Sequence, residues 1–300
     1  KLQTYTADTM TIDSDKEPFQ IKEGPWAGRT LYELYEEAYT PWDWQPDLQE
    51  ISHEHNLDFF STPFDASAVE FLEDLDVPVY KIASFENVDL PLIRQIAETG
   101  KPTIMSTGMA TLGEIDEAVR AFRDAGGTEL ALLACTSSYP APPEEMHLRR
   151  IPHLGETFDV VPGLSDHTLG IEVPVAGISL GARIVEKHLT LSREEEGPDS
   201  DFSLEPDEFS EMVQAVRKTE KAIGDVRYET TEKESESEPF RRSLFVVEDI
   251  KEGEPFTNEN VRSIRPGHGL PPKHLECILG RSAAQDISRG APLAWIDIAE

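Results

Sequence analysis

The feature that most constrains the fold is an alternation of short apolar runs with amphipathic stretches through the first three quarters of the chain. The apolar runs predict strands at Lys1–Tyr5, Leu57–Thr62, Val77–Ser84, Pro102–Thr107, Glu129–Thr136, Val160–Ser165 and Arg183–Thr190. Helical spacing of apolar residues occurs between them in Ala66–Leu75, Pro91–Thr99, Leu112–Ala125 and Ile171–Leu180. Repeated strand–helix units predict a parallel sheet covered by helices.

The number of predicted strands is one short of a (β/α)8 TIM barrel, which has eight strands in about 250 residues. We therefore expect an α/β barrel whose first strand is missing, so that the opening strand takes the second place. An open doubly wound sheet is the alternative. The long excursion from Asp8 to Gln49 contains a helix-like stretch, Leu31–Thr40. Long loops of this kind usually shape the mouth of a barrel active site.

The chain is expected to divide into three parts. Residues 1–224 would form the barrel domain, and residues 225–239 a charged linker without apolar periodicity. Residues 240–300 would form a small, mostly β domain, with short β-like runs at Ser243–Val247, Val261–Arg265 and Ala283–Asp286. About sixty residues are marginal for independent stability, so we expect this domain to lean on a partner surface.

Acidic residues outnumber basic ones 58 to 27, which gives a net charge of −31. Such a surface argues against nucleic-acid binding, because phosphates need a basic face. The acids are spread along the chain, which indicates adaptation to a salt-rich cytoplasm where screening weakens their repulsion; plain acidity is the alternative. The sequence shows no membrane span and no signal peptide, and Cys135 and Cys277 match no metal or disulfide spacing. We therefore expect a reducing, cytoplasmic location.

Two histidines give the clearest chemical signal. His167 follows one predicted strand and His188 lies near the end of the next. Neighbouring parallel strands stand ~4.8 Å apart, so two imidazoles at their carboxyl ends can share one ion. Imidazoles with water and substrate oxygens suit Mn²⁺, with Mg²⁺ or Co²⁺ as alternatives, and such an open site can polarise a carbonyl. On spacing alone, a hydrogen-bonded core or loop histidine is the favoured interpretation for each.

Other candidates lie on the same predicted strands. Glu186 shares a strand face with His188, where it could orient a sugar hydroxyl, act as a general base or form a barrel ion pair. Lys81 lies in an apolar strand and needs either a ligand anion or a protein carboxylate. Tyr139 and Arg265 are further candidates, with packing and surface exposure as their simpler interpretations. Hydroxyl residues that could bind phosphate or cap helices end several strands: Ser61, Thr62, Ser84, Ser106, Thr107, Thr136, Ser137 and Ser138.

Together these motifs resemble the sialic acid synthase family. The matching segments of the barrel are Phe60–Asp65, Lys81–Ser84, Ser106–Met109, Cys135–Pro140, Gly163–Thr168, Glu186–His188 and Gly197–Asp199. Arg241–Ser243, Asp249–Gly253 and Arg265–Gly267 resemble its antifreeze-like, or SAF, domain. Trp26–Tyr35 and Ala38–Trp42 are most similar to the pseudaminic acid synthase branch. The family's first strand, with its Glu-Ile-Gly motif, has no counterpart here.

The resemblance implies a metal-dependent transferase that condenses phosphoenolpyruvate, an N-acetylated amino sugar and water to a nonulosonic acid and phosphate. The sugar would be a 2,4-diacetamido-2,4,6-trideoxyhexose or N-acetylmannosamine. A domain-swapped homodimer is also implied, in which Arg265 reaches the acceptor bound by the other subunit. The implied roles are metal binding by His167 and His188; phosphoenolpyruvate binding by Thr62, Lys81, Ser84, Ser106 and Ser137; acceptor contact and catalysis by Tyr139 and Glu186; and substrate contact by Lys1, Gln3 and Ser165.

Two rival interpretations stay open. A synthase of seven- or eight-carbon keto acids would use related chemistry, but such enzymes lack the SAF domain that carries Arg265. A truncated, non-catalytic homologue could instead bind sugars during polysaccharide assembly, and the missing first strand is the main support for that reading.

Overall fold

The computed structural model describes residues 1–24, 26–195 and 197–299. Two compact units make up the structure, Lys1–Gly224 and Asp225–Glu300. Each unit has a hydrophobic core of its own. No helix among the described residues is long and apolar enough to cross a membrane.

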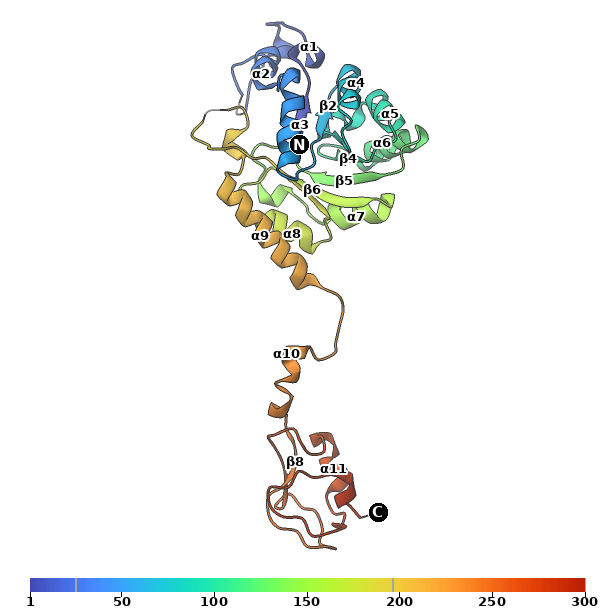
Figure 1. Ribbon diagram of the computed structural model, residues 1–300, viewed down its shortest axis with the longest axis vertical. Helices are drawn as coiled ribbons and strands as arrows, with labels where there is room; N and C mark the ends of the chain where they lie inside the picture. The colour runs from blue at the N-terminus through green and yellow to red at the C-terminus, as the bar shows by residue number, and fades with distance from the viewer. Residues whose placement is uncertain (25, 196, 300) are drawn as a thin grey trace. The chain divides into compact units, whose positions relative to one another are not determined.

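The first unit is built on a seven-stranded parallel sheet. Its strands are β1 Leu2–Thr4, β2 Ser61–Pro63, β3 Tyr80–Ile82, β4 Thr103–Ser106, β5 Leu130–Cys135, β6 Val161–Asp166 and β7 Ile184–Lys187. Each strand pairs in parallel with the next one along the chain, and the sheet curls into a half-barrel (Figure 1). A doubly wound sheet would reverse its strand order at a switch point, and this sheet does not. The predicted barrel lacking one strand is therefore confirmed.

Helices lie around the outside of these strands (Figure 1). They are α4 Ala66–Asp74, α5 Leu90–Glu98, α6 Leu112–Asp124, α7 Arg150–Phe158, α8 Glu172–Ser179 and α9 Pro206–Ile223. Local signals set their starts: the Asp65 carboxylate accepts the N–H groups of Ser67 and Ala68, and Thr111 and Glu114 form a capping box. Their apolar faces, including Leu72 and Phe122, are fully buried against the sheet.

The helix α7 was not predicted, because Pro152 and Gly155 lie within it and both have low helix propensity. Packing explains the glycine. A Cβ at Gly155 would stand 3.2 Å from the Pro162 ring of β6, so the absence of a side chain lets helix and strand approach closely. Tertiary contact thus overrides local propensity at this point.

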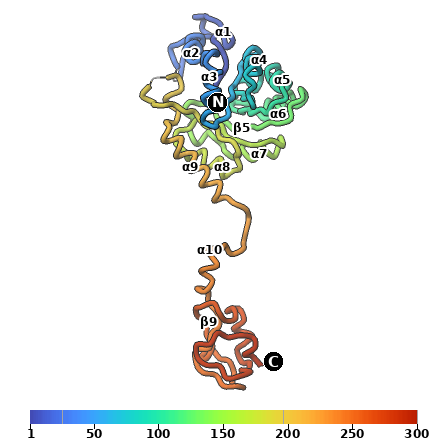
Figure 2. Tube along the Cα trace, in the orientation of Figure 1, coloured from blue at the N-terminus to red at the C-terminus, as the bar shows by residue number. Residues whose placement is uncertain are grey.

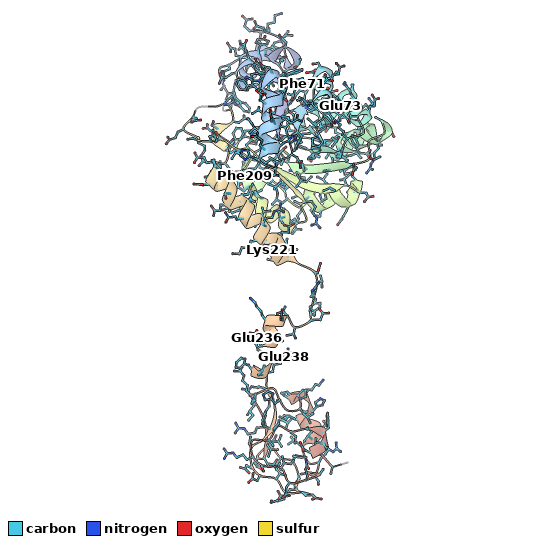
Figure 3. All side chains as sticks on the ribbon, viewed as in Figure 1. Phe71, Glu73, Phe209, Lys221, Glu236 and Glu238 are labelled. Carbon is cyan, nitrogen blue, oxygen red and sulfur yellow. The ribbon has the colours of Figure 1, made fainter. Side chains whose placement is uncertain are left out.

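The excursion between β1 and β2 holds α1 Ala7–Met10, α2 Leu31–Ala38 and α3 Gln45–Glu54, which Figure 2 shows gathered on one side of the first unit. The predicted helix Leu31–Thr40 ends at Ala38, because Pro41 disfavours helical backbone at the residue before it. The Trp42 indole donates to the Tyr5 carbonyl at 3.0 Å and its ring lies 4.9 Å from that of Phe71, which is labelled in Figure 3. These contacts fix the excursion to the barrel.

The second unit contains an antiparallel pair of strands, β8 Ser243–Val246 and β9 Val261–Ile264. The predicted β-like run Ala283–Asp286 makes a single isolated bridge, between Ala283 and Ile298, and is not a strand. Turns with positive φ at Gly280 and Gly290 limit pairing on either side of it. Short helices occur at α10 Glu232–Ser235, inside the predicted linker, and at α11 Leu275–Ile278.

Candidate functional site

A cavity of about 500 Å³ lies at the carboxyl ends of the strands in the first unit. Almost all of the predicted site residues line it: Lys1, Gln3, Thr62, Lys81, Ser84, Ser106, Tyr139, Ser165, His167, Glu186 and His188. The exceptions are Ser137 and Arg265. Residues from seven separate strands or the loops after them therefore meet in one space, as barrel geometry requires.

The strand-end residues of the cavity, which we call its floor, include Glu186 between two lysines. One of its oxygens lies 3.4 Å from the Lys1 ammonium, and the other lies 3.6 Å from that of Lys81 and accepts the Ser165 hydroxyl at 2.7 Å. Burial alone would raise the pKa of Glu186, but the cations of Lys81 and Lys1 outweigh it and hold the pKa well below its ordinary value. Glu186 is therefore ionised, and it is the protein carboxylate that partners Lys81.

Lys81 reaches the phosphate-binding candidates from β3. Its side chain is 2% exposed, and its ammonium donates to the Ser106 hydroxyl at 2.7 Å and to the Ile82 carbonyl at 2.8 Å. Burial lowers the pKa of Lys81 and Glu186 offsets part of this effect, so an anion bound beside the ammonium would further stabilise its charged form. The floor of the cavity can therefore hold a phosphate or carboxylate group.

The strand-ending hydroxyls divide into two groups. Thr62, Ser84 and Ser106 face the cavity. The others have partners elsewhere: Ser61 bonds to Thr4, and Thr107, Thr136 and Ser138 donate to backbone carbonyls. Residue type alone could not predict which hydroxyls face the cavity and which bond to other parts of the protein.

Ser137 lies just behind the cavity wall, beside Ser84. Gly108 makes this arrangement possible: a Cβ there would stand 2.2 Å from the Ser137 hydroxyl oxygen and 2.7 Å from that of Ser84. The Gly108 N–H donates to the Ser84 hydroxyl at 3.0 Å. Ser137 therefore lies near Ser84 but is not among the described residues that line the cavity.

The two histidines lie side by side, with ring centroids 5.3 Å apart. Nδ1 of His167 lies 3.0 Å from the Thr136 carbonyl oxygen. A carbonyl can only accept, so Nδ1 carries a proton, and in the neutral form of the ring Nε2 has the lone pair for another partner. Nδ1 of His188 lies 3.4 Å from an Asp199 carboxylate oxygen. The Tyr139 ring packs 4.5 Å from that of His167.

This arrangement fits a metal ion that takes two ligands from the protein. Within the described residues, no group of three or more His, Cys, Asp and Glu side chains is placed to hold a metal. An ion at the histidine pair would complete its coordination with water and substrate oxygens, as open catalytic sites do. The fixed tautomer of His167 is the feature such a ligand needs.

Sequence reasoning missed Glu86, which lines the cavity from the turn after β3. Burial raises its pKa to about 7, and its Oε2 is buried without a hydrogen-bond partner in the described structure. It can therefore take up or release a proton near neutrality. Its place two residues after Ser84, directly behind a strand-end motif, was the available signal.

The excursion supplies an apolar wall opposite the floor, as its length predicted. The apolar side chains that it contributes are Met10, Ile21, Leu31, Leu34 and Ala38. The Trp26 indole also lines the cavity and donates to the Pro198 carbonyl at 2.8 Å. This bond ties the excursion to the loop after β7.

Comparison with known proteins is consistent with this geometry. Residues 1–228 match the model of the NeuB family, and residues 241–299 match that of the SAF domain. The chain belongs to the NeuB family. The pseudaminic acid synthase of Campylobacter jejuni is 47% identical over 293 residues, covering 98% of this chain and 85% of the relative.

Two further matches support the assignment of the chain to the NeuB family. The pseudaminic acid synthase of Helicobacter pylori is 42% identical over 99% of this chain and 88% of the relative. The crystal structure of a spore coat polysaccharide biosynthesis protein from Bacillus subtilis matches with a TM-score of 0.60 and 33% identity, over 94% of this chain and 83% of that one. The resemblance inferred from the motifs is thereby confirmed.

In this NeuB-family chain, Arg265 belongs to the SAF domain. It directly follows β9 and is exposed, whereas every residue of the cavity belongs to the first unit. The described residues of the cavity thus do not include Arg265, and its predicted role in a dimer stays a prediction.

Proposed function

We propose that this chain condenses phosphoenolpyruvate with an N-acetylated amino sugar and water, giving a nonulosonic acid and phosphate. The observation that carries the proposal is one cavity in which Lys81 and three strand-end hydroxyls lie beside the His167–His188 pair. Relatives 42–47% identical over nearly the whole chain are pseudaminic acid synthases, which supports the same reaction class.

Phosphoenolpyruvate would bind at the cavity floor. Its phosphate and carboxylate are anions, and the floor offers the ammonium groups of Lys1 and Lys81 with hydroxyls between them. Ionised Glu186 offsets part of this positive charge and limits how many anionic groups the floor accepts. This charge balance favours a ligand with a few fixed anionic groups over a bulk polyanion.

The enzyme is further proposed to depend on a divalent metal, Mn²⁺ with Mg²⁺ or Co²⁺ as alternatives, held by His167 and His188. When bound, such an ion supplies Lewis-acid polarisation of the acceptor aldehyde. Tyr139 packs on His167 and keeps its phenol protonated, because burial raises its pKa well above the ordinary value. The phenol can thus donate a hydrogen bond to the sugar in the part of the cavity beside the histidines.

Proton transfer is proposed to involve Glu86. In the reaction, C3 of phosphoenolpyruvate bonds to the aldehyde carbon, water adds to C2, and the C2–O bond to phosphate breaks. The aldehyde oxygen gains a proton and the water loses protons. A carboxyl whose pKa is about 7 can accept and return a proton at neutral pH, whereas ionised Glu186 orients groups by accepting hydrogen bonds.

The acceptor is proposed to be a diacetamido-trideoxyhexose rather than N-acetylmannosamine. The apolar wall of Met10, Ile21, Leu31 and Leu34 suits deoxygenated carbons and acetamido methyl groups. A sugar with more hydroxyls would leave polar groups without partners against this wall. N,N′-diacetyllegionaminate synthesis uses a similarly substituted sugar and is the second candidate.

Three wider properties are also proposed: a homodimer in which Arg265 acts on the acceptor bound by the other subunit, adaptation to high salt, and a cytoplasmic location. The homodimer would explain why an exposed arginine lies in a motif matching the SAF domain. The net charge of −31 supports the salt adaptation.

The deciding experiment is phosphate release from phosphoenolpyruvate in concentrated KCl, with and without Mn²⁺, against a panel of acetamido sugars. Release that needs both the metal and a diacetamido-trideoxy sugar is the expected result. Release with seven- or eight-carbon products from unsubstituted aldose phosphates would instead support the rival synthase. No release with any sugar would support the non-catalytic reading.

A further inference from the structure

A buried ion pair lies directly behind the two histidines. Asp166 ends β6 and Lys187 ends β7, and the two residues are register partners in the parallel pairing. The Lys187 ammonium stands 2.6 Å from Asp166 Oδ2, and both side chains are wholly buried. Each residue immediately precedes one of the histidines.

The ion pair occupies the face of the sheet opposite the cavity. Successive side chains of a strand alternate between faces, and the preceding register pair, Ser165 with Glu186, lines the cavity. Asp166 and Lys187 are absent from the cavity lining within the described residues. They therefore do not contact a molecule bound in the cavity, but they can act on the site through the backbone that carries the two histidines.

The pair also holds the turn that follows His167. Asp166 Oδ1 accepts the Thr168 N–H at 3.0 Å, and the Lys187 ammonium donates to the Thr168 carbonyl. His167 is thus held from both sides along the chain, because Asp166 before it and Thr168 after it belong to one hydrogen-bonded cluster. Its own carbonyl accepts the Ala141 N–H at 2.9 Å.

Stability is a poor explanation for such a pair. Burying two charges has a large solvation cost, and replacing a buried ion pair with apolar side chains of similar size is often neutral or stabilising. The ion pair instead specifies conformation, because its charges and hydrogen bonds are satisfied in only one register of β6 against β7 and one conformation of the turn after His167. A register slip of one residue would move His188 to the other face of its strand.

We infer that Asp166 and Lys187 are positioning residues that set the spacing and orientation of His167 and His188 for one shared divalent cation. This inference rests on the proposed metal site. The pair fixes β6 against β7 at the last residue before each histidine, so the 5.3 Å separation of the imidazoles depends on it. Groups that hydrogen-bond to metal ligands typically change metal affinity about 10–100-fold when they are lost, and the ion pair acts one step further from the ligands, so we expect the lower end of this range.

The test replaces both charges at once. Asp166→Leu with Lys187→Met removes the pair without leaving one buried charge alone. We expect a melting temperature within a few degrees of wild type, together with Mn²⁺ binding at least about 10-fold weaker in titrations followed by electron paramagnetic resonance. Wild-type Mn²⁺ affinity in this folded variant would overturn the inference. If it does not fold, Asp166→Asn is measured in the same way.

A matched control removes an ion pair far from the histidines. Lys101 lies in the turn before β4, with its ammonium 2.9 Å from Glu73 of α4 (labelled in Figure 3) and 3.1 Å from Asp76. Lys101→Met should leave Mn²⁺ affinity unchanged whatever it does to the melting temperature. An equal loss of affinity in this control would show that general destabilisation weakens the site, and would overturn the inference.

A second readout does not depend on metal binding. Nitrogen-15 spectra of the imidazoles report the tautomer of His167, which the Thr136 carbonyl fixes with the proton on Nδ1. We expect the double variant to lose this fixed form. If wild type binds no Mn²⁺, or His188→Ala binds it equally well, the proposed metal site is wrong. In that case, spectra of the double variant identical to those of wild type would also refute the inference that the ion pair positions the histidines. Altered spectra would show that it does position them, although not for a metal.

Discussion

The two walls of the cavity differ in origin and in chemistry. The floor is formed by strand ends, where Lys81, Glu186 and the histidines are held by the sheet and its ion pairs. The opposite wall comes from the excursion between β1 and β2 and is mostly apolar. This contrast supports the proposal that the floor carries out the condensation and that the excursion selects the sugar. The loops of a barrel can change specificity in this way without disturbing its chemistry.

The largest predicted effect lies on the floor. His188→Ala should lower metal-dependent phosphate release on the order of 10³-fold, because polarisation of the aldehyde is worth several kcal/mol. Circular dichroism should show an intact fold. His153→Ala, an exposed histidine of α7, is the matched control and should leave turnover unchanged. Full activity in the His188 variant would contradict the metal assignment.

Glu86 sharpens the assignment of roles within the cavity. Glu86→Gln should lower kcat about 100-fold and remove the limb of the pH–rate profile near pH 7, because the proton carrier is lost. Steady-state rates between pH 5 and 9 provide the measurement. Glu98→Gln, at the exposed end of α5, is the control. An unchanged pH limb would assign proton transfer to another group.

The same residue predicts how stability depends on pH. Burial raises the Glu86 pKa from 4.5 to about 7, so the folded protein keeps a proton that the unfolded chain has lost. This contribution to stability is fully present below about pH 4.5 and is lost as the pH rises through about 7. The melting temperature of Glu86→Gln should therefore rise relative to wild type between pH 5 and pH 8. A constant difference would argue against the raised pKa.

The apolar wall should control the sugar and not phosphoenolpyruvate. Ile21→Asn is expected to raise the KM for a diacetamido-trideoxy sugar about 10-fold, because an apolar contact becomes a polar one. The KM for phosphoenolpyruvate should stay unchanged, and Ile51→Asn on the exposed face of α3 should affect neither. Equal changes in both KM values would remove the proposed division between the walls.

A third contributor to the site would be the SAF domain of a second subunit. Arg265→Ala and His188→Ala should each be inactive alone, yet a 1:1 mixture that exchanges subunits should recover about a quarter of wild-type activity, because mixed dimers keep one intact site. Phosphate release after mixing and re-equilibration measures this. A mixture as inactive as its components would place Arg265 outside a shared site.

The smallest predicted effect concerns the acidic surface that surrounds both walls. The melting temperature should rise by several degrees between low and molar KCl, because screening relieves repulsion among acids that outnumber basic residues 58 to 27. Differential scanning calorimetry over this range tests it. A flat or falling melting temperature would leave plain acidity as the explanation.

Much of the fold could be predicted from the sequence. Short apolar runs located the strands of the first unit, and apolar residues at helical spacing located α4, α5, α6 and α8. The helix α7 was missed because Pro152 and Gly155 weaken its local signal, although Gly155 allows close packing against β6. The strand-end motifs identified the floor, and the place of Glu86 two residues after Ser84 was a signal that could have been used. The raised pKa of Glu86 and the pairing of Asp166 with Lys187 depend on tertiary contacts and could not be predicted.

The sequence by itself determined the order of the strand–helix units and the kinds of side chain at the strand ends. The order follows from short apolar runs separated by stretches of helical spacing, and the strand-end residues are read directly from the chain, so both depend only on neighbouring positions. Only the tertiary structure decided that Glu186 is the partner of Lys81, that Ser84 and Ser106 but not Ser137 face the cavity, and that Glu86 titrates near neutrality. Ion pairing and pKa depend on distance and burial between residues remote in sequence, and those arise only when the strands come together.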